Sequence, residues 1–404
     1  MDPKRQLEII KEGCVELLPE KELLDKLKRK KQLRIKWGAD PSAPDLHLGH
    51  TVVIKKLRDF QQLGHKIVFI IGDFTGMIGD PSGKSDIRKP LTSREVKENA
   101  RTYKDQIFKV LDPKKTEIVF NSKWLRKLTL EDVINLAGKY TVARMLERDD
   151  FIKRYTEERP ISIHEFLYPL IQGYDSVKVK ADVEIGGTDQ KFNLLVGREL
   201  QREFNVEPQV IMTMPLLEGT DGVQKMSKSL NNYIGITEPA GEIFGKTMSI
   251  PDNIMIKYFE LLSGLPLSEV NKIKEGLYAG TLHPKEIKKR LARFFVALYH
   301  SKDAALKAEK EFEAVFKDKG LPAEIPIFYI DKKELDTEGD IWLAKAMVVS
   351  GLSSSSSEAV RLIEQGAVKI EEAVVNDRKA KIKITEDELL LKVGKRKFMK
   401  IKRK

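Results

Sequence analysis

The chain has 404 residues, of which 41% are hydrophobic and 33% charged, and its formal net charge is +11. This length exceeds what one hydrophobic core usually supports, and the composition is typical of a globular protein, which excludes global disorder. The single cysteine, Cys14, cannot form an intramolecular disulfide, and residues 1–31 lack the apolar run of a signal peptide or membrane span. We therefore expect a cytoplasmic protein whose positive charge serves either a polyanionic partner or simple solubility.

The first half of the chain alternates between helix and strand patterns. Apolar positions at helical spacing predict two helices in residues 3–30, separated at Pro19, and a further helix at 48–63. Short apolar runs predict strands, which we expect at residues 32–37, 66–72, 117–120, 181–185 and 209–212. This order predicts an α/β domain over residues 1–236, with a Rossmann-like, doubly wound parallel sheet.

The rest of the chain departs from this alternation. Short helical patterns at about 131–160 indicate an insertion that could supply a dimer surface. Residues 237–319 contain helical patterns only and predict an all-α domain. Residues 320–340 combine prolines with charges that follow no period, which is typical of a linker, and 341–404 predict a small, basic α+β module.

A His-x-Gly-His motif, His47 to His50, follows the first predicted strand and begins a helix. A helix N-terminus offers free N–H groups and the positive end of the helix dipole, so a phosphate can bind there. Gly49 lets a nucleotide approach, and both histidines can donate hydrogen bonds to phosphate oxygens. The alternative is that the histidines only cap or pack the helix start.

A second motif, Lys-Met-Ser-Lys-Ser at residues 225–229, lies in a segment with loop composition. Such a loop could close over a triphosphate and bring Lys225 and Lys228 to the negative charge that develops on a leaving pyrophosphate. Taken alone, a run of lysine and serine is more often a solvated surface loop.

Together the two motifs resemble the paired signature of the class I aminoacyl-tRNA synthetases. The second motif matches completely, and the first has Leu48 where isoleucine is usual. The resemblance implies that the motifs face each other across Mg-ATP, the substrate complex, with no tightly bound cofactor and no protein-bound metal. The catalytic residues that it implies are His47, His50, Lys225 and Lys228. The implied ATP-binding residues are Asp40, Ser42, His47, Gly49, His50, Gly187, Asp189, Lys225 and Lys228.

The segment 168–175 bears on the choice of amino acid. Tyr168, Gln172 and Asp175 share one face of a predicted helix, and a buried Asp175 could accept a hydrogen bond from a tyrosine hydroxyl. The segment resembles the tyrosine-binding helix of bacterial tyrosyl-tRNA synthetases. The alternative is an amphipathic helix whose polar stripe faces solvent.

Two glycine-rich turns, at 79–83 and 185–190, extend the resemblance to the tyrosine enzymes. They imply that Asp80 binds the substrate ammonium and that Gln190 reaches the substrate. The implied tyrosine-binding residues are Gly38, Asp80, Tyr168, Gln172, Asp175 and Gln190. One position departs from the pattern: Lys36 stands where many bacterial tyrosine enzymes carry a tyrosine that shares recognition of the hydroxyl. The second partner of the hydroxyl therefore stays open. The turn Trp-Gly-Ala-Asp-Pro after Lys36 resembles that of one bacterial subgroup.

The basic module, residues 341–404, contains 15 Lys and Arg against 8 Asp and Glu, so 15 minus 8 gives +7 of the chain's +11. Its pattern of turn, capped helix, glycine and strand resembles an S4-type RNA-binding module. The alternative is a charged, solvated tail. Candidate contacts to an RNA backbone are Arg361, Lys369, Arg378, Lys379, Lys381, Lys395, Arg396 and Lys397.

The resemblance as a whole implies a homodimeric tyrosine–tRNA ligase with L-tyrosine, ATP and tRNA-Tyr as partners. It implies that residues 1–236 form the catalytic domain and that the all-α domain, residues 237–319, meets the anticodon. One alternative is a tryptophan enzyme of the same fold; Asp175 and the S4-like module favour tyrosine. A regulatory RNA-binding protein on a synthetase scaffold is a second alternative, against which both intact motifs argue. A small-molecule adenylyltransferase with the same His-x-Gly-His turn is a third, although it would not need the helical domain and basic module.

Overall fold

The computed structural model describes residues 1–41, 44–80, 92–317, 325–337, 339–371, 373–394 and 397–403. The predicted site residues Ser42, Lys395 and Arg396, and residues 81–83 of the first glycine-rich turn, lie outside these ranges. The chain forms two compact units, Met1–Leu306 and Lys307–Lys404. Over the described residues, no helix has the length and apolarity needed to cross a membrane.

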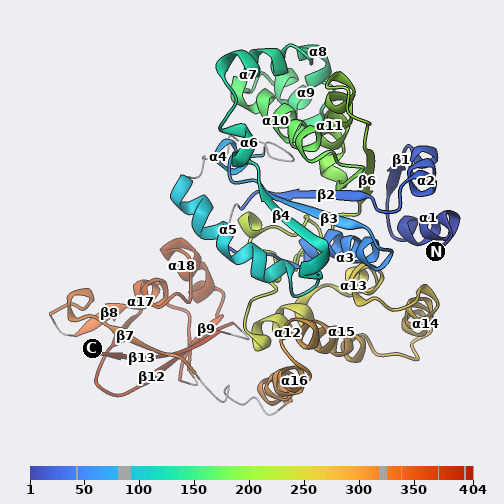
Figure 1. Ribbon diagram of the computed structural model, residues 1–404. Helices are drawn as coiled ribbons and strands as arrows, with labels where there is room; N and C mark the ends of the chain where they lie inside the picture. Colours follow the sequence, from blue (N-terminus) through green and yellow to red (C-terminus); the bar gives the residue numbers. More distant parts are fainter. Residues whose placement is uncertain are drawn as a thin grey trace. The chain divides into compact units, whose positions relative to one another are not determined.

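The first unit is built on a six-stranded sheet with the order β1-β6-β5-β2-β3-β4 (Figure 1). Its strands are β1 (Glu16–Leu18), β2 (Arg34–Ala39), β3 (Lys66–Ile71), β4 (Thr116–Phe120), β5 (Val183–Gly187) and β6 (Val210–Met214). β2 to β6 run parallel, which confirms the doubly wound sheet, and β1 pairs antiparallel with β6 at the edge. β1 was not predicted, because a strand of three residues at the edge of the sheet is too short to show an alternation of apolar and polar residues.

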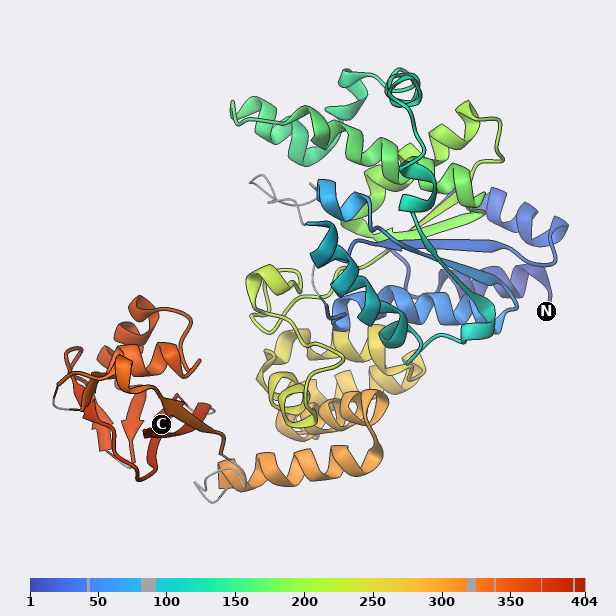
Figure 2. The ribbon, with the colours of Figure 1, turned by 60° about the vertical axis from the view of Figure 1, so that its left-hand side comes forward.

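Helices cover both faces of this sheet, with α10 and α11 on one face and α3 on the other (Figures 1 and 2). The helices before the helical segment are α1 (Pro3–Lys11), α2 (Glu20–Arg29), α3 (Leu48–Gln62), α4 (Thr75–Ile78), α5 (Ser93–Ile107), α6 (Ser122–Leu125), α7 (Leu130–Ala137), α8 (Val142–Met145), α9 (Asp149–Thr156), α10 (Ile163–Val179) and α11 (Lys191–Glu203). α10 and α11 approach closely at two glycines: a Cβ on Gly173 would lie 3.1 Å from the Cα of Gly197. The residues of α7, α8 and α9 are the predicted insertion.

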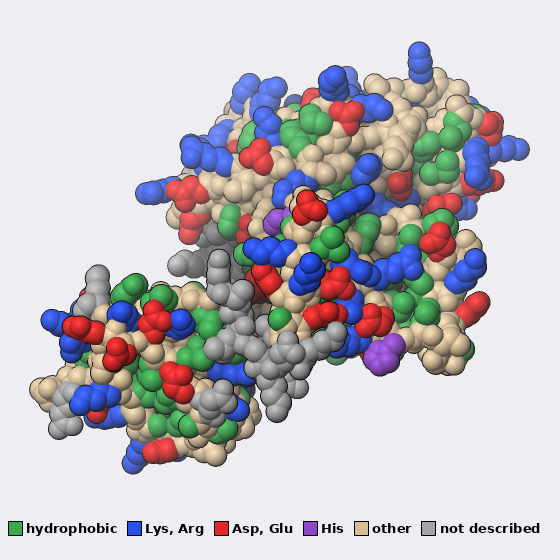
Figure 3. All heavy atoms as spheres, turned by 90° about the horizontal axis from the view of Figure 1, so that it is seen from below, with side chains coloured by type: hydrophobic (Ala, Val, Ile, Leu, Met, Phe, Trp, Pro, Cys, Tyr) green, Lys and Arg blue, Asp and Glu red, His purple; other side chains and the backbone are tan. Residues whose placement is uncertain are grey.

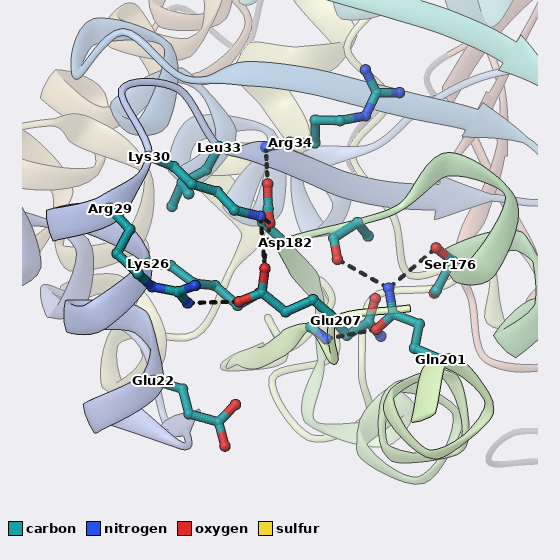
Figure 4. A network of polar contacts seen from close by, with 12 residues as sticks. Glu22, Lys26, Arg29, Lys30, Leu33, Arg34, Ser176, Asp182, Gln201 and Glu207 are labelled. Atoms are coloured by element: carbon teal, nitrogen blue, oxygen red, sulfur yellow. Dashed lines mark hydrogen bonds and ion pairs between the residues drawn. The ribbon is translucent and has the colours of Figure 1, made fainter. Parts of the chain in front are cut away.

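The N-terminal helices are tied to the sheet by ion pairs around Glu207 (Figure 4). Lys26 is buried and lies 3.1 Å from Glu207, and Arg29 and Lys30 bind the same carboxylate at 2.7 and 2.9 Å. Lys30 also pairs with Asp182, just before β5. Helix α2 is thereby held against the segments that lead into β5 and β6.

From residue 240 to residue 317 the chain is helical, as predicted, and the last of these helices continues past the end of the first unit at Leu306. The elements are α12 (Ala240–Ser249), α13 (Asp252–Tyr258), a π-helical turn η4 (Phe259–Ser263), α14 (Leu267–Tyr278), α15 (Pro284–Tyr299) and α16 (Lys302–Lys317). The hydroxyl of Tyr258 donates to the backbone carbonyl of Glu218 at 2.7 Å, and Lys55 of α3 donates to that of Leu261. These bonds join the helical segment to the α/β part.

The second unit packs α17 (Leu343–Val349) and α18 (Ser356–Glu364) against small sheets around one apolar core. Its strands are β7 (Ile327–Ile330), β8 (Asp340–Trp342), β9 (Val368–Ile370), β10 (Ala373–Val375), β11 (Lys381–Lys383), β12 (Leu389–Val393) and β13 (Lys397–Arg403). Ser355 caps α18 by accepting from the backbone N–H of Glu358, and Gly366 follows the helix with a φ of +65°. The predicted turn, capped helix, glycine and strand are therefore present.

Part of the predicted linker is wrong. β7 lies inside residues 320–340 and pairs in parallel with β13 over four residue pairs, Lys400 to Arg403 opposite Ile327 to Ile330. The sequence Ile-Phe-Tyr-Ile has the β-branched and aromatic residues that strands favour, but the neighbouring prolines and charges hid it. Residues 327–330 therefore belong to the sheet of the second unit.

Candidate active site

A cavity of about 620 Å³ opens where β2, β3 and β5 end. Carboxyl ends of parallel strands meet at one edge of a sheet, which is where such folds bind their ligands. Every predicted ATP and tyrosine residue that the structure describes lines this cavity: Gly38, Asp40, His47, Gly49, His50, Asp80, Tyr168, Gln172, Asp175, Gly187, Asp189, Gln190, Lys225 and Lys228. Segments far apart in the sequence thus meet around one space.

The two histidines begin helix α3 with their rings in contact, 3.9 Å between centroids and tilted by 43° to one another. The backbone N–H of His47 donates to Nδ1 of His50 at 3.2 Å, which leaves Nε2 of His50 to carry the proton of a neutral ring. Burial and the nearby charge of Lys228 lower the pKa of His50 to about 3, and burial first, then His50, holds the pKa of His47 well below its usual range. Both rings are therefore neutral hydrogen-bonding groups at pH 7.

Gly49 lies between the histidines for a steric reason. A Cβ at this position would lie 3.0 Å from two ring atoms of His47 and 3.6 Å from the Cβ of Met226. The glycine lets the His47 ring fold back over the helix start and lets the loop of the second motif approach it. The two motifs are therefore in contact through Gly49.

The lysines of the second motif are both paired inside the protein. Lys225 forms an ion pair of 2.8 Å with Asp189, and Lys228 donates to the backbone carbonyl of Asp45. Burial lowers the pKa of Lys228 to about 8, although Asp45 opposes this. Asn232 ties the loop together by accepting from the backbone N–H of Ser227 at 2.8 Å. A phosphate ligand would have to replace Asp189 and Asp45 as partners of these ammonium groups.

Asp175 is buried on helix α10 and accepts two hydrogen bonds, from Nε1 of Trp124 at 2.8 Å and from Nδ2 of Asn121 at 3.2 Å. Burial raises its pKa to about 7, against the lowering effects of Lys36 and of the two hydrogen bonds. Asn121 and Trp124 were missed in the sequence. Their position directly after β4, at the same sheet edge, is the signal that could have found them.

A chain of hydrogen bonds runs from Asn121 across the cavity. Asn121 donates to Oγ1 of Thr75 at 3.0 Å, and Thr75 donates to Oδ1 of Asp40 at 2.6 Å. The hydroxyl of Tyr168 donates to the other carboxylate oxygen of Asp40 at 2.8 Å. Asp40, expected at ATP, thus contacts Tyr168, expected at the amino acid. The two predicted sets of residues form one polar wall.

On the other side of the cavity, side-chain amides hold Asp80 and Gln172. Gln190 donates to Oδ2 of Asp80 at 2.8 Å, and Nδ2 of Asn193 donates to Oε1 of Gln190 and of Gln172 at 3.0 and 3.1 Å. Burial and the carboxylates of Asp40, Asp80 and Asp175 raise the pKa of Tyr168 well above its ordinary value. The carboxylates of Asp40 and Asp80 in this part of the cavity favour a cationic group, and Asp80 already has Arg148 at 3.9 Å.

Lys36 is not a free donor in the cavity. Its ammonium forms an ion pair of 2.8 Å with Glu184 and donates to Oγ of Ser176 at 2.6 Å and to the backbone carbonyl of Gln172 at 3.0 Å. All three of its N–H donors are therefore occupied by protein atoms.

Comparison with known proteins identifies the family. Residues 28–317, well over half of the chain, match the model for "tRNA synthetases class I (W and Y)", and residues 341–389 match the S4 domain. The chain belongs to the class I tRNA synthetases for tryptophan and tyrosine. The sheet, the cavity and the contact between the two motifs are thus those of an aminoacyl-tRNA ligase.

Relatives of this synthetase extend over its whole length. The tyrosine–tRNA ligase of Carboxydothermus hydrogenoformans is 56% identical over 402 residues, which is 98% of each chain. That of Moorella thermoacetica is 57% identical over 98% of this chain and 95% of its own. The solved tyrosyl-tRNA synthetase of Archaeoglobus fulgidus, complexed with L-tyrosine, has a TM-score of 0.63 and 24% identity and covers 76% of this chain and 99% of its own. At that identity it shows the fold alone.

The predicted RNA contacts of the synthetase that the structure describes lie on several elements of the S4 unit. Arg361 is on α18, Lys369 on β9, Lys381 on β11 and Lys397 on β13, whereas Arg378 and Lys379 precede β11. Lys369 is half-buried and the other five are exposed. Lys381 pairs with Asp336 at 2.8 Å, Arg378 lies 3.8 Å from Glu364, and Lys397 donates to the carbonyl of Leu352. In Figure 3 basic and acidic side chains are mixed on the face of this unit that is seen.

Replacing Asp175 by asparagine tests whether burial raises the pKa of Asp175. The pKa of Asp175 is raised from 3.8 to about 7 on folding, so the stability contributed by its protonated form is present below about pH 4 and is lost as pH rises through 7. Asparagine does not titrate. We expect the stability of Asp175→Asn relative to the native chain to improve by on the order of 2 kcal/mol between pH 5 and pH 8.

Thermal unfolding in denaturant at both pH values measures this change. The matched control is Asp303→Asn at an exposed position of α16, for which no such change with pH is expected. A stability difference between Asp175→Asn and the native chain that stays constant from pH 5 to pH 8 would contradict the assignment.

Proposed function

We propose that the chain is a tyrosine–tRNA ligase, which activates L-tyrosine with ATP to tyrosyl-adenylate and transfers tyrosine to the 3′ end of tRNA-Tyr. The observation that carries this proposal is the burial of Asp175 in the cavity. The carboxylate is oriented by Trp124 and Asn121, and it can accept more hydrogen bonds than these two. The relatives named tyrosine–tRNA ligase support the same choice.

The hydroxyl of tyrosine would satisfy Asp175, whereas phenylalanine would leave a desolvated carboxylate without that donor. An unpaired buried polar group costs more than a hydrogen bond contributes, so the site would reject phenylalanine mainly by this penalty. The indole of tryptophan also has an N–H, but its larger ring system demands a differently shaped cavity. Asp175 therefore serves as the specificity residue.

The amino group of tyrosine would bind among Asp80, Tyr168, Gln172 and Gln190, where nearby carboxylates favour a cation. Asp80 is already oriented by Gln190. Gly38, at the end of β2, leaves room beside the ring of the substrate. These contacts would place the tyrosine carboxylate toward the two motifs.

Activation would proceed by attack of the tyrosine carboxylate on the α-phosphorus of Mg-ATP. A new P–O bond forms to tyrosine while the bond to the β-phosphate oxygen breaks, and pyrophosphate leaves with the electron pair. His47 and His50 would donate to the α-phosphate oxygens, and Lys225 and Lys228 would neutralise the pyrophosphate. No side chain forms a covalent bond, so the catalysis rests on positioning and electrostatic stabilisation.

The adenosine would lie over the turn that follows β5. A Cβ on Gly187 would meet the carboxylate of Asp189 at 2.5 Å and Leu216 at 2.8 Å, so a larger residue would displace the side chains of Asp189 and Leu216. Asp189 would accept from the ribose hydroxyls once Lys225 moves to the phosphates. Lys225 would thus change its partner from Asp189 to the phosphates when the nucleotide binds. This change would couple nucleotide binding to the second motif.

The S4 unit would bind the tRNA backbone through its exposed Lys and Arg side chains, and the helical segment after residue 239 would meet the anticodon. Phosphate contacts release counterions, so affinity falls with salt in proportion to their number. As an enzyme of translation, the protein would act in the cytoplasm together with its tRNA.

The insertion and the start of α10 would form the interface of a homodimer. This part of the surface exposes large apolar side chains, at Leu130, Ile134, Val142, Ile152, Tyr155 and Ile163, of which Leu130 and Ile163 are each 76% exposed. Clusters of this kind mark interaction surfaces. Sedimentation velocity at micromolar concentration should find a dimer; a monomer there would refute this assignment.

Exchange between ATP and pyrophosphate tests the activity directly. We expect exchange with tyrosine and none above background with phenylalanine or tryptophan, at equal enzyme and Mg-ATP. Exchange with tryptophan would refute the assignment of Asp175, and no exchange with any of the three would refute the catalytic proposal.

Replacing Lys228 by alanine should lower tyrosine-dependent exchange by about 100-fold, since removing one pre-positioned group that stabilises a transition state has effects of this order. Tyrosine binding, measured by fluorescence titration without ATP, should stay within about twofold. The control is Lys310→Ala on the exposed side of α16, which should keep full exchange activity. An unchanged rate for Lys228→Ala would remove Lys228 from the mechanism.

Replacing the exposed Lys379 by alanine tests the RNA surface. If Lys379 contacts one phosphate, the slope of log affinity for tRNA against log salt should decrease by about 1. Lys345, in the same unit but paired with Glu334 at 3.0 Å, gives the matched control Lys345→Ala, for which the slope should not change. Equal slopes for Lys379→Ala and the native chain would exclude this contact.

A further inference from the structure

The floor of the cavity contains an ion pair that the proposed mechanism does not use. Lys36 on β2 and Glu184 on β5 both line the cavity, with side chains only 1% and 2% exposed and a separation of 2.8 Å. Taking two charges out of water is costly, and a buried pair is often no more stable than an apolar one. A purely stabilising role is therefore a weak explanation for charges at this place.

The pair is fully hydrogen-bonded. Lys36 also donates to Ser176 and to the carbonyl of Gln172, and Oε2 of Glu184 accepts from Ser176 at 2.8 Å and from the amide of Gln209. The backbone carbonyl of Ser176 accepts in turn from Gln201 at 3.2 Å (Figure 4). The network joins β2, β5 and helix α10.

The two residues of α10 that accept hydrogen bonds from Lys36 lie on either side of Asp175 in the sequence. Gln172 precedes it by three residues and Ser176 follows it directly. Pro169 lies inside α10 and has no N–H for the helical hydrogen-bond ladder, so this helix has one internal bond fewer to hold its conformation. Lys36 therefore fixes, against the sheet, the helical turn that carries Asp175.

The charge of Lys36 also acts on Asp175. The charged and titratable groups that act on this carboxyl are Lys36 from β2, Glu184 from β5 and Tyr168 from α10, whereas Asn121 and Trp124 are neutral donors. After the rise caused by burial, the largest influence on the pKa of Asp175 is its lowering by Lys36, which exceeds the opposing effect of Glu184. The pair as a whole thus favours the ionised carboxylate.

We propose that Lys36, held in place by Glu184, is a positioning residue for recognition of the substrate hydroxyl, because it fixes the Asp175 turn of α10 and keeps the carboxylate a hydrogen-bond acceptor. The inference rests on the proposed tyrosine–tRNA ligase activity. Lys36 does not contact the hydroxyl itself, since its three donors are already used. It determines specificity through Asp175.

The double variant Lys36→Met/Glu184→Gln tests the proposal. It removes both charges together, because removal of one alone would leave the other buried without its partner. Methionine keeps an unbranched side chain of similar length. Thermal unfolding first establishes that the variant is folded, and kcat/KM for ATP–pyrophosphate exchange is then measured with tyrosine and with phenylalanine from pH 6 to pH 9.

We expect the double variant to lose roughly fivefold in kcat/KM for tyrosine at pH 7, because a rise of one unit in the pKa of Asp175 from about 7 lowers its ionised fraction at pH 7 by about that factor. The loss should shrink toward pH 9, where the carboxylate ionises again, and the residual rate with phenylalanine should change by less than about twofold. Activities are expressed relative to the native chain at each pH, so that the titration of Lys228 cancels.

The matched control is Lys26→Met/Glu207→Gln, which removes another buried lysine and its carboxylate partner (Figure 4), neither of which lines the cavity. This variant should keep the native ratio of tyrosine to phenylalanine at every pH. An equal loss with both amino acids in Lys36→Met/Glu184→Gln would overturn the proposal in favour of a general structural role. A loss with tyrosine alone that does not change with pH would refute the effect of Lys36 on the charge of Asp175 and support only its positioning of the α10 turn.

The native chain, assayed in parallel, separates this inference from the proposed function. If it exchanges with tyrosine and the folded double variant keeps both the native ratio and the native pH profile, the role of Lys36 is refuted while the function stands. If the native chain does not exchange with tyrosine, the proposed function fails, and the inference fails with it.

Discussion

Burial of charge is the constraint on which this site depends. Lys36, Asp175 and Glu184 are buried at the floor of the cavity, where each charge needs a partner at hydrogen-bonding distance. The partners come from β2, β5, α10 and the residues after β4, so the sheet and the helix must be in register before any of them is satisfied. The close contact of α10 with α11 at Gly173 and Gly197 holds that register from the other side.

At the nucleotide end of the cavity, the charged groups are likewise paired within the protein. Lys225 and Lys228 are bound to Asp189 and to the carbonyl of Asp45, and the histidines are neutral, with their rings in contact. The two lysines expected to act on phosphate are thus satisfied by protein atoms that a nucleotide would displace. Binding energy from the nucleotide would have to exceed that of these internal bonds, which makes the arrangement of the second motif dependent on its ligand.

Much of this architecture could be predicted from the sequence because its signals are local. The five parallel strands are apolar runs, and the two motifs are short and stand at strand ends. Three features escaped prediction. β1 and β7 are stabilised by strands that lie far away in the sequence, β6 and β13 respectively. Asn121 and Trp124 belong to the site only because β4 ends beside α10. Lys36 could be recognised in the sequence as unusual. Its pairing with Glu184 could not be predicted, because it depends on β5 lying next to β2 in the sheet.

The parallel pairing of β7 with β13 has a consequence for where the C-terminal unit begins as an independent folding module. The match to the S4 domain starts at residue 341, after β7. A fragment cut at that residue would expose β13, seven residues long, as an open edge strand with its N–H and C=O groups unpaired on one side. Such an edge is a template for association between chains. A soluble S4 fragment of this chain therefore has to begin before Ile327, some way upstream of the conserved-domain boundary.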